Sequence, residues 1–351
     1  MGSRSSPRIL ILRMSAIGDT ILSLPALCAL RARFPQAHLC WVVEAPGAPL
    51  LREHPEIDEL IVLPRRWFKS PREIWKLVRR VRAGKFDIAL DLQCRLKTAL
   101  VGWLSGAPQR IGYGDRYAGE GSTWFDNCRV HVQSTHLVDR SLELLAPLGI
   151  QHPAVTFGLP IDPAAQRTMR QFLQQAGIRY PFAVLSAGAS WASKVWPPER
   201  YGLVAQHLAD KHHMQSVVIR ALGAEQAWSE AIVANSAGHA VMAPPATLVE
   251  LAALLHEARL FLGNDTGPMH LAVAVGTPCI VLHGTTRPQD CGPYGSQHIA
   301  IQEYFQAGNR RYRKRAANDA MRAIQVERVS AACDELLARP APARHAGSFA
   351  A

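Results

Sequence analysis

The chain has 351 residues, of which 48% are apolar and 7% aromatic, and it carries a formal net charge of +11. This length allows two domains, and this composition is typical of a soluble globular protein. The charge predicts attraction to phosphates on nucleotides, nucleic acid or an anionic membrane surface. The basic residues are dispersed apart from runs at 65–82 and 310–315, without a nucleic-acid motif, so we expect no nucleic-acid partner.

Apolar runs and helical patterns alternate along the first 160 residues. Strands are expected at 8–12, 39–43, 60–63 and 86–90, and amphipathic helices at 20–34 and 71–82. Alternating strands and helices predict a parallel sheet with right-handed crossovers.

The same alternation restarts after a proline-bearing linker at 149–163. The predicted strands are 182–185, 216–220, 260–262 and 278–282, and the predicted helices are 198–209, 225–234, 248–256, 268–275 and 326–337. We therefore expect two doubly wound, Rossmann-like α/β domains facing a cleft, at 1–160 and 161–338, and a disordered tail at 339–351.

The cysteine pattern and the apolar runs also restrict the class of protein. Seven cysteines are scattered without a C-x-x-C pair, which is typical of a reduced, cytoplasmic protein without a zinc site. No apolar run is long enough for a transmembrane helix.

Three polar turns follow predicted strands, where doubly wound sheets bind their ligands. They are Ser15–Asp19, Ser186–Lys194 and Asp265–Gly267. The last turn leads into a helix that begins near Pro268, so free backbone amides and the helix dipole predict an anion site there. The alternative is that Asp265 and Thr266 only cap the helix.

Several standard motifs are absent from the sequence. It has no Walker A loop, G-x-S-x-G elbow or H-E-x-x-H motif, and Tyr117 replaces the third glycine of a dinucleotide fingerprint. It also lacks D-x-D, so metal-assisted chemistry is weakly supported. A carboxylate in one domain and a lysine beside a helix N-terminus in the other suit transfer from a nucleotide-activated donor.

A set of motifs resembles the lipopolysaccharide heptosyltransferase family, in order from about residue 8 to about residue 337. They are the stretch 11–20 with Leu24-Pro25-Ala26, Asp91-Leu-Gln93 with Lys97, Arg110-Ile-Gly112, His136 with Arg140, Lys194-x-Trp-Pro197, Asp265-Thr-Gly-Pro-Met-His270, Gly284–Pro288 and Gly292–Gly295. The combination of S-x-x-G-D with D-T-G-x-x-H is fairly specific.

The resemblance implies an inverting GT-B glycosyltransferase without an essential metal or other cofactor. Its donor would be ADP-heptose, and its acceptor a Kdo or heptose of the lipid-linked lipopolysaccharide inner core. The enzyme would be cytoplasmic and peripheral on the anionic inner face of the inner membrane.

The resemblance also assigns roles to residues. Asp19 falls on the proposed general base, and Lys194 on a catalytic lysine that contacts the donor phosphate. The predicted donor-binding residues are Lys194, Glu225, Asp265, Thr266, Gly267 and His270. The predicted acceptor-binding residues include Ser15, Gly18, Lys97 and Arg140. Arg65, Arg66, Lys69 and Arg72 are added to them because an enzyme that holds a phosphorylated, carboxylate-rich glycolipid needs basic contacts.

Each assignment has a structural alternative. Asp19 could simply cap a helix, His270 could be a core histidine, and Glu230 competes with Glu225 for the ribose. The basic segment 65–72 could be a solvated face, with Trp67 and Phe68 as packing residues or interface anchors.

Two departures from the family pattern leave further points open. Thr285 stands where relatives carry proline, and the segment 308–320 lacks the cysteines of many relatives. The rival functions are a GT-B enzyme with another nucleotide sugar or a protein acceptor, and a non-catalytic nucleotide-sugar-binding protein.

Overall fold

The computed structural model describes residues 6–119, 121–189, 191–220 and 223–340. The chain divides into two compact units, Met1–Pro160 and Ile161–Ala351, here called the N-terminal and C-terminal units. Most of the predicted disordered tail, residues 341–351, lies outside the described residues. Arg339 is described: it follows the last helix and donates a hydrogen bond to the carbonyl of Ser296.

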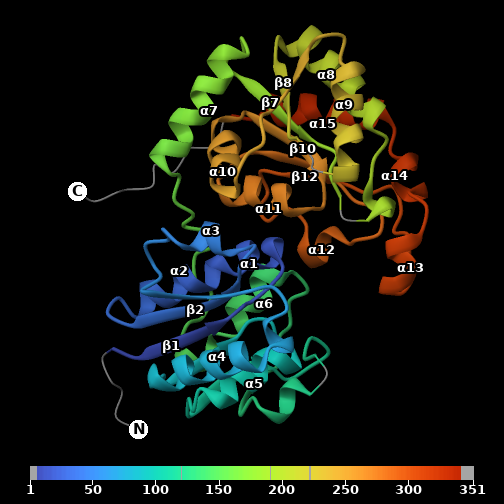
Figure 1. Ribbon diagram of the computed structural model, residues 1–351. Helices are drawn as coiled ribbons and strands as arrows, with labels where there is room; N and C mark the ends of the chain where they lie inside the picture. Colours follow the sequence, from blue (N-terminus) through green and yellow to red (C-terminus); the bar gives the residue numbers. More distant parts are fainter. Residues whose placement is uncertain (1–5, 120, 190, 221–222, 341–351) are drawn as a thin grey trace. The chain divides into compact units, whose positions relative to one another are not determined.

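The N-terminal unit is built on a six-stranded parallel sheet with the order β3-β2-β1-β4-β5-β6 (Figure 1). The strands are β1 (Arg8–Leu12), β2 (His38–Glu44), β3 (Glu59–Leu63), β4 (Ile88–Asp91), β5 (Gln109–Tyr113) and β6 (Cys128–Val130). The sequence predicts the first four. It does not predict β5 and β6, which are partly exposed and carry polar residues instead of an apolar run.

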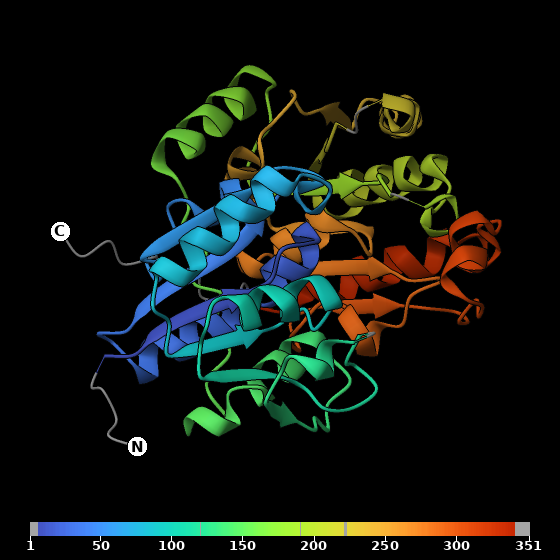
Figure 2. The same ribbon diagram turned by 60° about the horizontal axis from the view of Figure 1, so that its bottom comes forward.

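Helices cover both faces of this sheet. On one face, α4 (Pro71–Ala83) and α5 (Leu96–Leu104) pack on Leu10 and Leu12 of β1, and Figure 2 shows both helices lying across the strands. On the other face, α2 (Leu24–Arg33) packs against α6 (Leu137–Glu143). The alternation of side chains along each strand therefore supplies two apolar layers.

The single helix predicted at 20–34 is wrong, because the structure has two helices there. Helix α1 (Ile17–Leu22) ends at Ser23, and α2 begins with Pro25 in its first turn. Proline has no N–H to continue the hydrogen-bond ladder of α1, and the Ser23 hydroxyl bonds the carbonyl of Asp19 at 2.8 Å. Asp19 consequently lies in a short helix that starts directly after the β1 loop.

The C-terminal unit contains a second parallel sheet, with the order β12-β11-β10-β7-β8-β9. Its strands are β7 (Phe182–Ser186), β8 (Gln215–Val218), β9 (Ala240–Met242), β10 (Leu260–Asn264), β11 (Cys279–Leu282) and β12 (Ile299–Ile301). Counted along the chain from β7, this is the same doubly wound order as in the N-terminal unit, and it confirms the predicted fold class.

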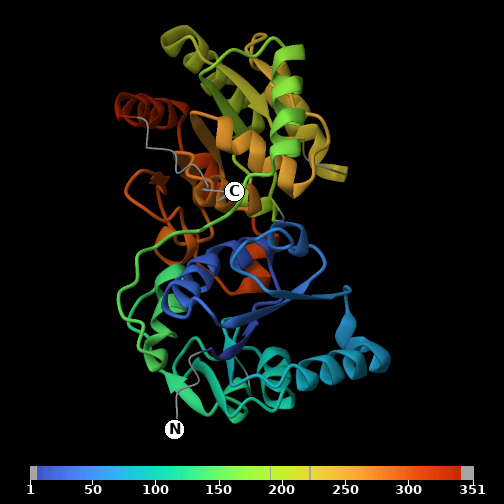
Figure 3. The ribbon, with the colours of Figure 1, turned by 90° about the vertical axis from the view of Figure 1, so that its left-hand side faces the viewer.

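Helices cover both faces of the second sheet as well. Helix α8 (Pro198–His212) and α15 (Val326–Ala338) pack with Leu260 and Leu262 of β10 in one core, beside α9 (Gln226–Ala234). Figure 3 shows α15 in red on one side of the sheet and α7 (Pro163–Gln175) in green on the other, where α10 (Leu248–Glu257) and α11 (Gly267–Ala274) also lie. Shorter helices are α3 (Ala48–Leu51), α12 (Pro288–Cys291), α13 (Arg310–Arg315) and α14 (Asp319–Ala323). Throughout the described part of the chain, every helix is too short or too polar to span a membrane.

Candidate active site

The predicted base, Asp19, lies in the first turn of α1, and its side chain is 46% exposed. Its Oδ2 atom accepts a hydrogen bond from the backbone N–H of Ala16 at 3.3 Å and lies 3.0 Å from a guanidinium nitrogen of Arg13. Arg13 is buried, and it also donates to the carbonyl of Leu92 at 2.6 Å. Asp19 thus does contact the start of the helix, but it is also an exposed carboxylate held by a buried cation.

The D-x-Q motif at the end of β4, Asp91 to Gln93, stabilises the loop between β1 and α1. The Gln93 side chain accepts the backbone N–H of Met14 at 2.9 Å. Asp91 is fully buried and accepts hydrogen bonds from Thr98 Oγ1 and from the backbone N–H groups of Gln93 and Cys94. Burial raises the pKa of Asp91 to about 6 despite these bonds. These bonds hold the turn that supports Arg13.

A second buried carboxyl group, Asp126, lies near Asp91 and was not predicted. Burial and the charge of Asp91 raise the pKa of Asp126 to about 7. The two carboxyl groups and Cys94 bring potential metal-ligating atoms within 4.8 Å of one another. However, the Cys94 thiol donates to the Asp91 carbonyl and accepts the Tyr113 N–H, and burial raises its pKa. The thiol is thus engaged in hydrogen bonds within the turn, and the two carboxyl groups are buried beside it.

The other predicted acceptor residues are spread over the carboxyl-end loops of the N-terminal sheet. Ser15 and Gly18 flank the start of α1, and Lys97, from α5 after the adjacent strand β4, forms an ion pair with Glu44 at 2.9 Å. The guanidinium of Arg140, in α6, stacks 3.8 Å from the ring centroid of Tyr117. Helix α6 contacts α1, so Arg140 belongs to the same side of the unit as Asp19.

The basic segment, defined as Arg65, Arg66, Lys69 and Arg72, lies elsewhere in this unit. It follows β3, which is two strands from β1, and all four side chains are exposed. None of the four has an ion-pair partner within the described ranges. Trp67 is buried and packs in the core, whereas Phe68 is 49% exposed. One strand, β2, therefore lies between the strand that precedes this segment and the strand that precedes Asp19.

The donor-side residues meet between the neighbouring strands β7 and β10 of the C-terminal unit. The Lys194 ammonium lies 2.8 Å from Oδ2 of Asp265 and 3.0 Å from its main-chain carbonyl. The side chains are 14% and 5% exposed, respectively. Burial alone would raise the pKa of Asp265, but Lys194, His270 and His283 hold it well below the usual range. The pair is a buried, ionised contact at the topological switch point of the sheet.

The N-terminus of α11 adjoins this pair. Nε2 of His270 lies 3.5 Å from Oδ1 of Asp265, and burial lowers the pKa of His283 to about 4. Thr266 occupies the N-cap position of α11, but its hydroxyl bonds the carbonyl of Asn264 and makes no capping hydrogen bond to the helix. At Gly267 a Cβ atom would meet nothing within 4 Å, which leaves open space beside the helix N-terminus.

Glu225 lies beside the same loop, before α9. Burial raises its pKa, while a hydrogen bond from the backbone N–H of Ala189 acts in the opposite direction. Its competitor Glu230 is exposed on α9 and accepts a hydrogen bond from Gln226 at 2.7 Å. The structure thus brings Glu225, and not Glu230, to the loop that carries Lys194.

The contribution of α13 to this region was not predicted from the sequence. Lys194 and Lys314 lie 5.1 and 5.7 Å from the ring centroid of Trp191, and the Ser193 hydroxyl donates to the carbonyl of Arg313. The sequence shows a basic run at 310–315, but it does not indicate that this run lies beside the loop of Lys194. The structure places this run beside the loop of Lys194.

Comparisons with known proteins show which proteins this chain is similar to. The chain is 27% identical over 339 residues to lipopolysaccharide heptosyltransferase 3 from Escherichia coli, covering 91% of this chain and 96% of the relative. A family 9 glycosyl transferase from Veillonella parvula superposes with a TM-score of 0.79 at 23% identity, covering 95% of this chain and 97% of that one. The structure of E. coli heptosyltransferase WaaC with ADP-2-deoxy-2-fluoro heptose superposes with a TM-score of 0.73 at 21% sequence identity. The superposition covers 93% of this chain and 99% of that one. These two likenesses show the fold, which is that of GT-B heptosyltransferases.

The family itself follows from the sequence comparison. Residues 74–320, more than half of the chain, match the family model described as glycosyltransferase family 9 (heptosyltransferase). The chain therefore belongs to glycosyltransferase family 9 and is a glycosyltransferase of the heptosyltransferase type.

Proposed function

We propose that this enzyme transfers heptose from ADP-heptose to a Kdo or heptose of the lipopolysaccharide inner core. The observation that carries the proposal is the buried Lys194–Asp265 pair beside the open N-terminus of α11. A nucleoside diphosphate needs such a cation and free backbone amides, and the Escherichia coli relative that is 27% identical is a lipopolysaccharide heptosyltransferase.

On the donor side, Lys194 and the start of α11 hold the diphosphate. Asp265 binds the lysine from two directions, which positions the ammonium and leaves a third N–H for a phosphate oxygen. When the bond from the anomeric carbon to the phosphate oxygen breaks, the electron pair leaves with ADP. Lys194 and the helix dipole stabilise the charge that develops there.

On the acceptor side, Asp19 is the general base. Its exposed carboxylate accepts the proton of the acceptor hydroxyl while that oxygen bonds to the anomeric carbon, which inverts the centre. The ion pair with Arg13 holds the carboxylate in position. Arg13 is itself fixed by its hydrogen bond to the Leu92 carbonyl.

The proposed reaction requires no essential metal ion, since Lys194 and the α11 N-terminus supply the positive charge. Full transfer activity after treatment with EDTA is the expected result. Complete loss that magnesium restores would show instead that an ion carries the leaving charge.

We further propose that the N-terminal unit docks peripherally on the anionic inner face of the inner membrane. Trp75 of α4 is 61% exposed and Trp103 of α5 is 50% exposed, and these two helices pack against each other. Arg72, Lys76 and Arg79 are exposed on α4. Aromatic side chains beside basic ones suit the headgroup region of an anionic bilayer.

Donor turnover tests the function directly. The purified enzyme is incubated with ADP-, UDP- and GDP-linked sugars and a lipid-linked inner-core acceptor, and nucleotide release is measured. Turnover of ADP-heptose alone supports the proposal. Preference for another nucleotide sugar or a protein acceptor supports the first rival, and tight ADP-heptose binding without transfer or hydrolysis supports the non-catalytic one.

A further inference from the structure

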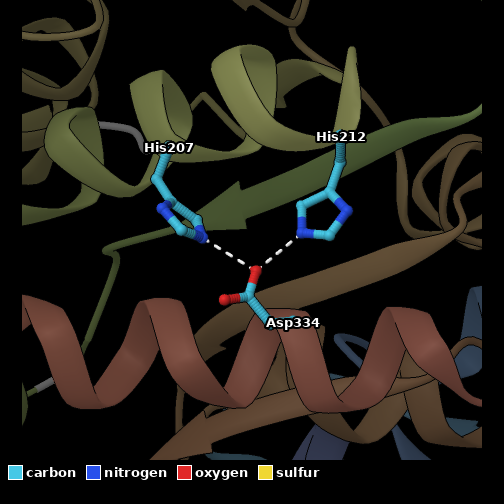
Figure 4. A group of neighbouring side chains, drawn as sticks. All are labelled: His207, His212 and Asp334. Carbon is cyan, nitrogen blue, oxygen red and sulfur yellow. Dashed lines mark hydrogen bonds and ion pairs between the residues drawn. The ribbon is translucent and has the colours of Figure 1, made fainter.

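Two histidines of α8 and one aspartate of α15 converge at the surface of the C-terminal unit (Figure 4). Nε2 of His212 lies 2.6 Å from Oδ1 of Asp334, and Nε2 of His207 lies 2.9 Å from the same oxygen. The side chains of these residues, here called the His–His–Asp cluster, are between 22% and 28% exposed. Solvent and small solutes can therefore reach them.

We propose that the His–His–Asp cluster binds a divalent transition-metal ion of the Zn²⁺ class and thereby cross-links α8 to α15. Two imidazole nitrogens and one carboxylate oxygen form a typical zinc ligand set, with water completing a tetrahedron. Every potential ligand atom already lies within 4.8 Å of the others. Ligands of a tetrahedral zinc ion are roughly 3.4 Å apart, so each nitrogen–oxygen pair needs to separate by less than ~1 Å.

The second oxygen of Asp334 is already held in a way that suits a metal ligand. Oδ2 accepts a hydrogen bond from the Lys211 ammonium at 2.8 Å, and Lys211 is 57% exposed. This bond can persist while Oδ1 binds the ion, and such outer hydrogen bonds orient ligating carboxylates.

The location indicates a structural role for the ion. Helix α15 packs on α8 through Val329, Ala332 and other core residues, and the cluster lies over this contact near the end of α8. The loop of Lys194 precedes the opposite end of α8, and a helix of 15 residues is about 22 Å long. The proposed ion therefore lies away from the donor-side residues, and its role is independent of the proposed reaction.

The linear sequence hides this ligand set. His207 and His212 belong to one helix, but Asp334 follows 122 residues after His212, so no zinc motif with a recognisable spacing exists. The cysteine pattern predicts a protein without a zinc site, but it carries no information on sites built from histidine and carboxylate ligands.

The test uses the untagged full chain, stripped of metal with EDTA. Titration with ZnCl₂ in a calorimeter should show one ion per chain, and zinc should raise the thermal unfolding midpoint by several degrees. His207→Gln, His212→Gln and Asp334→Asn should each abolish the calorimetric signal and the zinc-dependent rise. His213→Gln is the matched control, because His213 is exposed directly after α8, and it should retain both.

The zinc-dependent increment is the readout, because each cluster variant also loses a hydrogen bond and has a lower basal midpoint. Co²⁺ bound in place of zinc should give the absorption of a tetrahedral nitrogen–oxygen site without a thiolate charge-transfer band. Zinc binding that persists in all three cluster variants would place the ion elsewhere, for example on cysteines. If the wild-type chain binds no zinc, the cluster only links α8 to α15 by hydrogen bonds. Either result overturns the proposal.

Discussion

Strands β4 and β10 occupy equivalent positions in the two sheets, and each leads into a buried aspartate, yet the pKa values of the two carboxyl groups are shifted in opposite directions. Asp91, at the end of β4, accepts three hydrogen bonds, and burial raises its pKa to about 6. Asp265, directly after β10, binds Lys194, and its pKa is held well below the usual range although burial acts in the opposite direction.

The difference originates in the loop that follows the neighbouring strand. Lys194 follows β7 and reaches across to the aspartate of β10. In the N-terminal unit the cation after the equivalent strand, β1, is Arg13, and it pairs with Asp19 in the helix that follows. One unit thus has a buried ion pair suited to an anionic ligand, whereas the other has a buried acid and an exposed carboxylate suited to proton transfer.

The largest effect is expected at Asp19. Asp19→Asn should lower kcat by about 10²- to 10⁴-fold with ADP-heptose affinity nearly unchanged, because it removes the general base. Asp162→Asn is a matched control, since Asp162 bonds the backbone at the start of α7 at 2.7 Å without a proposed role in the reaction. Wild-type turnover by Asp19→Asn would contradict the assignment.

Removing the cation of the C-terminal unit should affect stability and function together. Lys194→Met leaves Asp265 buried without its main partner, which should lower the free energy of unfolding by roughly 3–5 kcal/mol and weaken ADP-heptose binding. The double variant Lys194→Met/Asp265→Asn should recover much of the stability in chemical denaturation but none of the donor affinity. If the double variant binds donor normally, the pair is purely structural.

The acids of the two units should respond to pH with opposite signs. A raised pKa, as at Asp126, contributes stability that is present below pH 4 and is lost as the pH rises through about 7. The effect of Asp126→Asn on the free energy of unfolding, measured against the wild type, should therefore be more favourable at pH 8 than at pH 5. The difference between the two effects should be on the order of 3 kcal/mol.

The lowered pKa of Asp265 contributes stability that is lost only as the pH falls far below 4. Asp265→Asn should consequently destabilise the protein by a similar amount at pH 5 and pH 8. Denaturation curves at the two pH values measure both variants, and parallel pH profiles for them would refute the contrast between the units.

The smallest effect is expected for the exposed basic segment. Replacing Arg65, Arg66 and Lys69 with Ala should raise the acceptor KM several-fold and flatten its salt dependence, because exposed charges are screened. The donor KM should not change. Replacing Arg33, Arg52 and Lys85 removes the same charge from exposed positions elsewhere in the unit and should leave the acceptor KM unaltered. A change confined to donor binding would show that the acceptor role belongs elsewhere.

Local patterns predicted the sheets wherever strands are buried on both faces. The run Ile9–Leu12 is fully buried, and its apolar sequence is sufficient to identify it. Strand β6 escaped prediction because its residues are partly exposed at the sheet edge, where hydrophobic periodicity gives no signal. The break between α1 and α2 depends on Pro25, which the helical spacing alone obscured.

The loops that carry the candidate site residues could be predicted from the sequence, but the contacts between their side chains could not. The turns after parallel strands lie at the carboxyl edge of each sheet. The loop of Asp19 in the first sheet and those of Lys194 and Asp265 in the second could therefore be identified from the alternation of elements. The contact of Lys194 with Asp265 joins residues 71 positions apart, and that of Arg13 with Asp19 depends on where α1 begins. Neither distance is encoded in local periodicity.

The packing of α15 against α8 also constrains the order in which the chain can fold during synthesis. The N-terminal unit is one continuous stretch, so it can fold while the rest of the chain is still being translated. The core of the C-terminal unit requires Val329, Ala332 and Leu336 from its last helix. Until α15 leaves the ribosome, Leu260 and Leu262 of β10 lack part of their cover, so the core of the C-terminal unit is completed only at the end of synthesis.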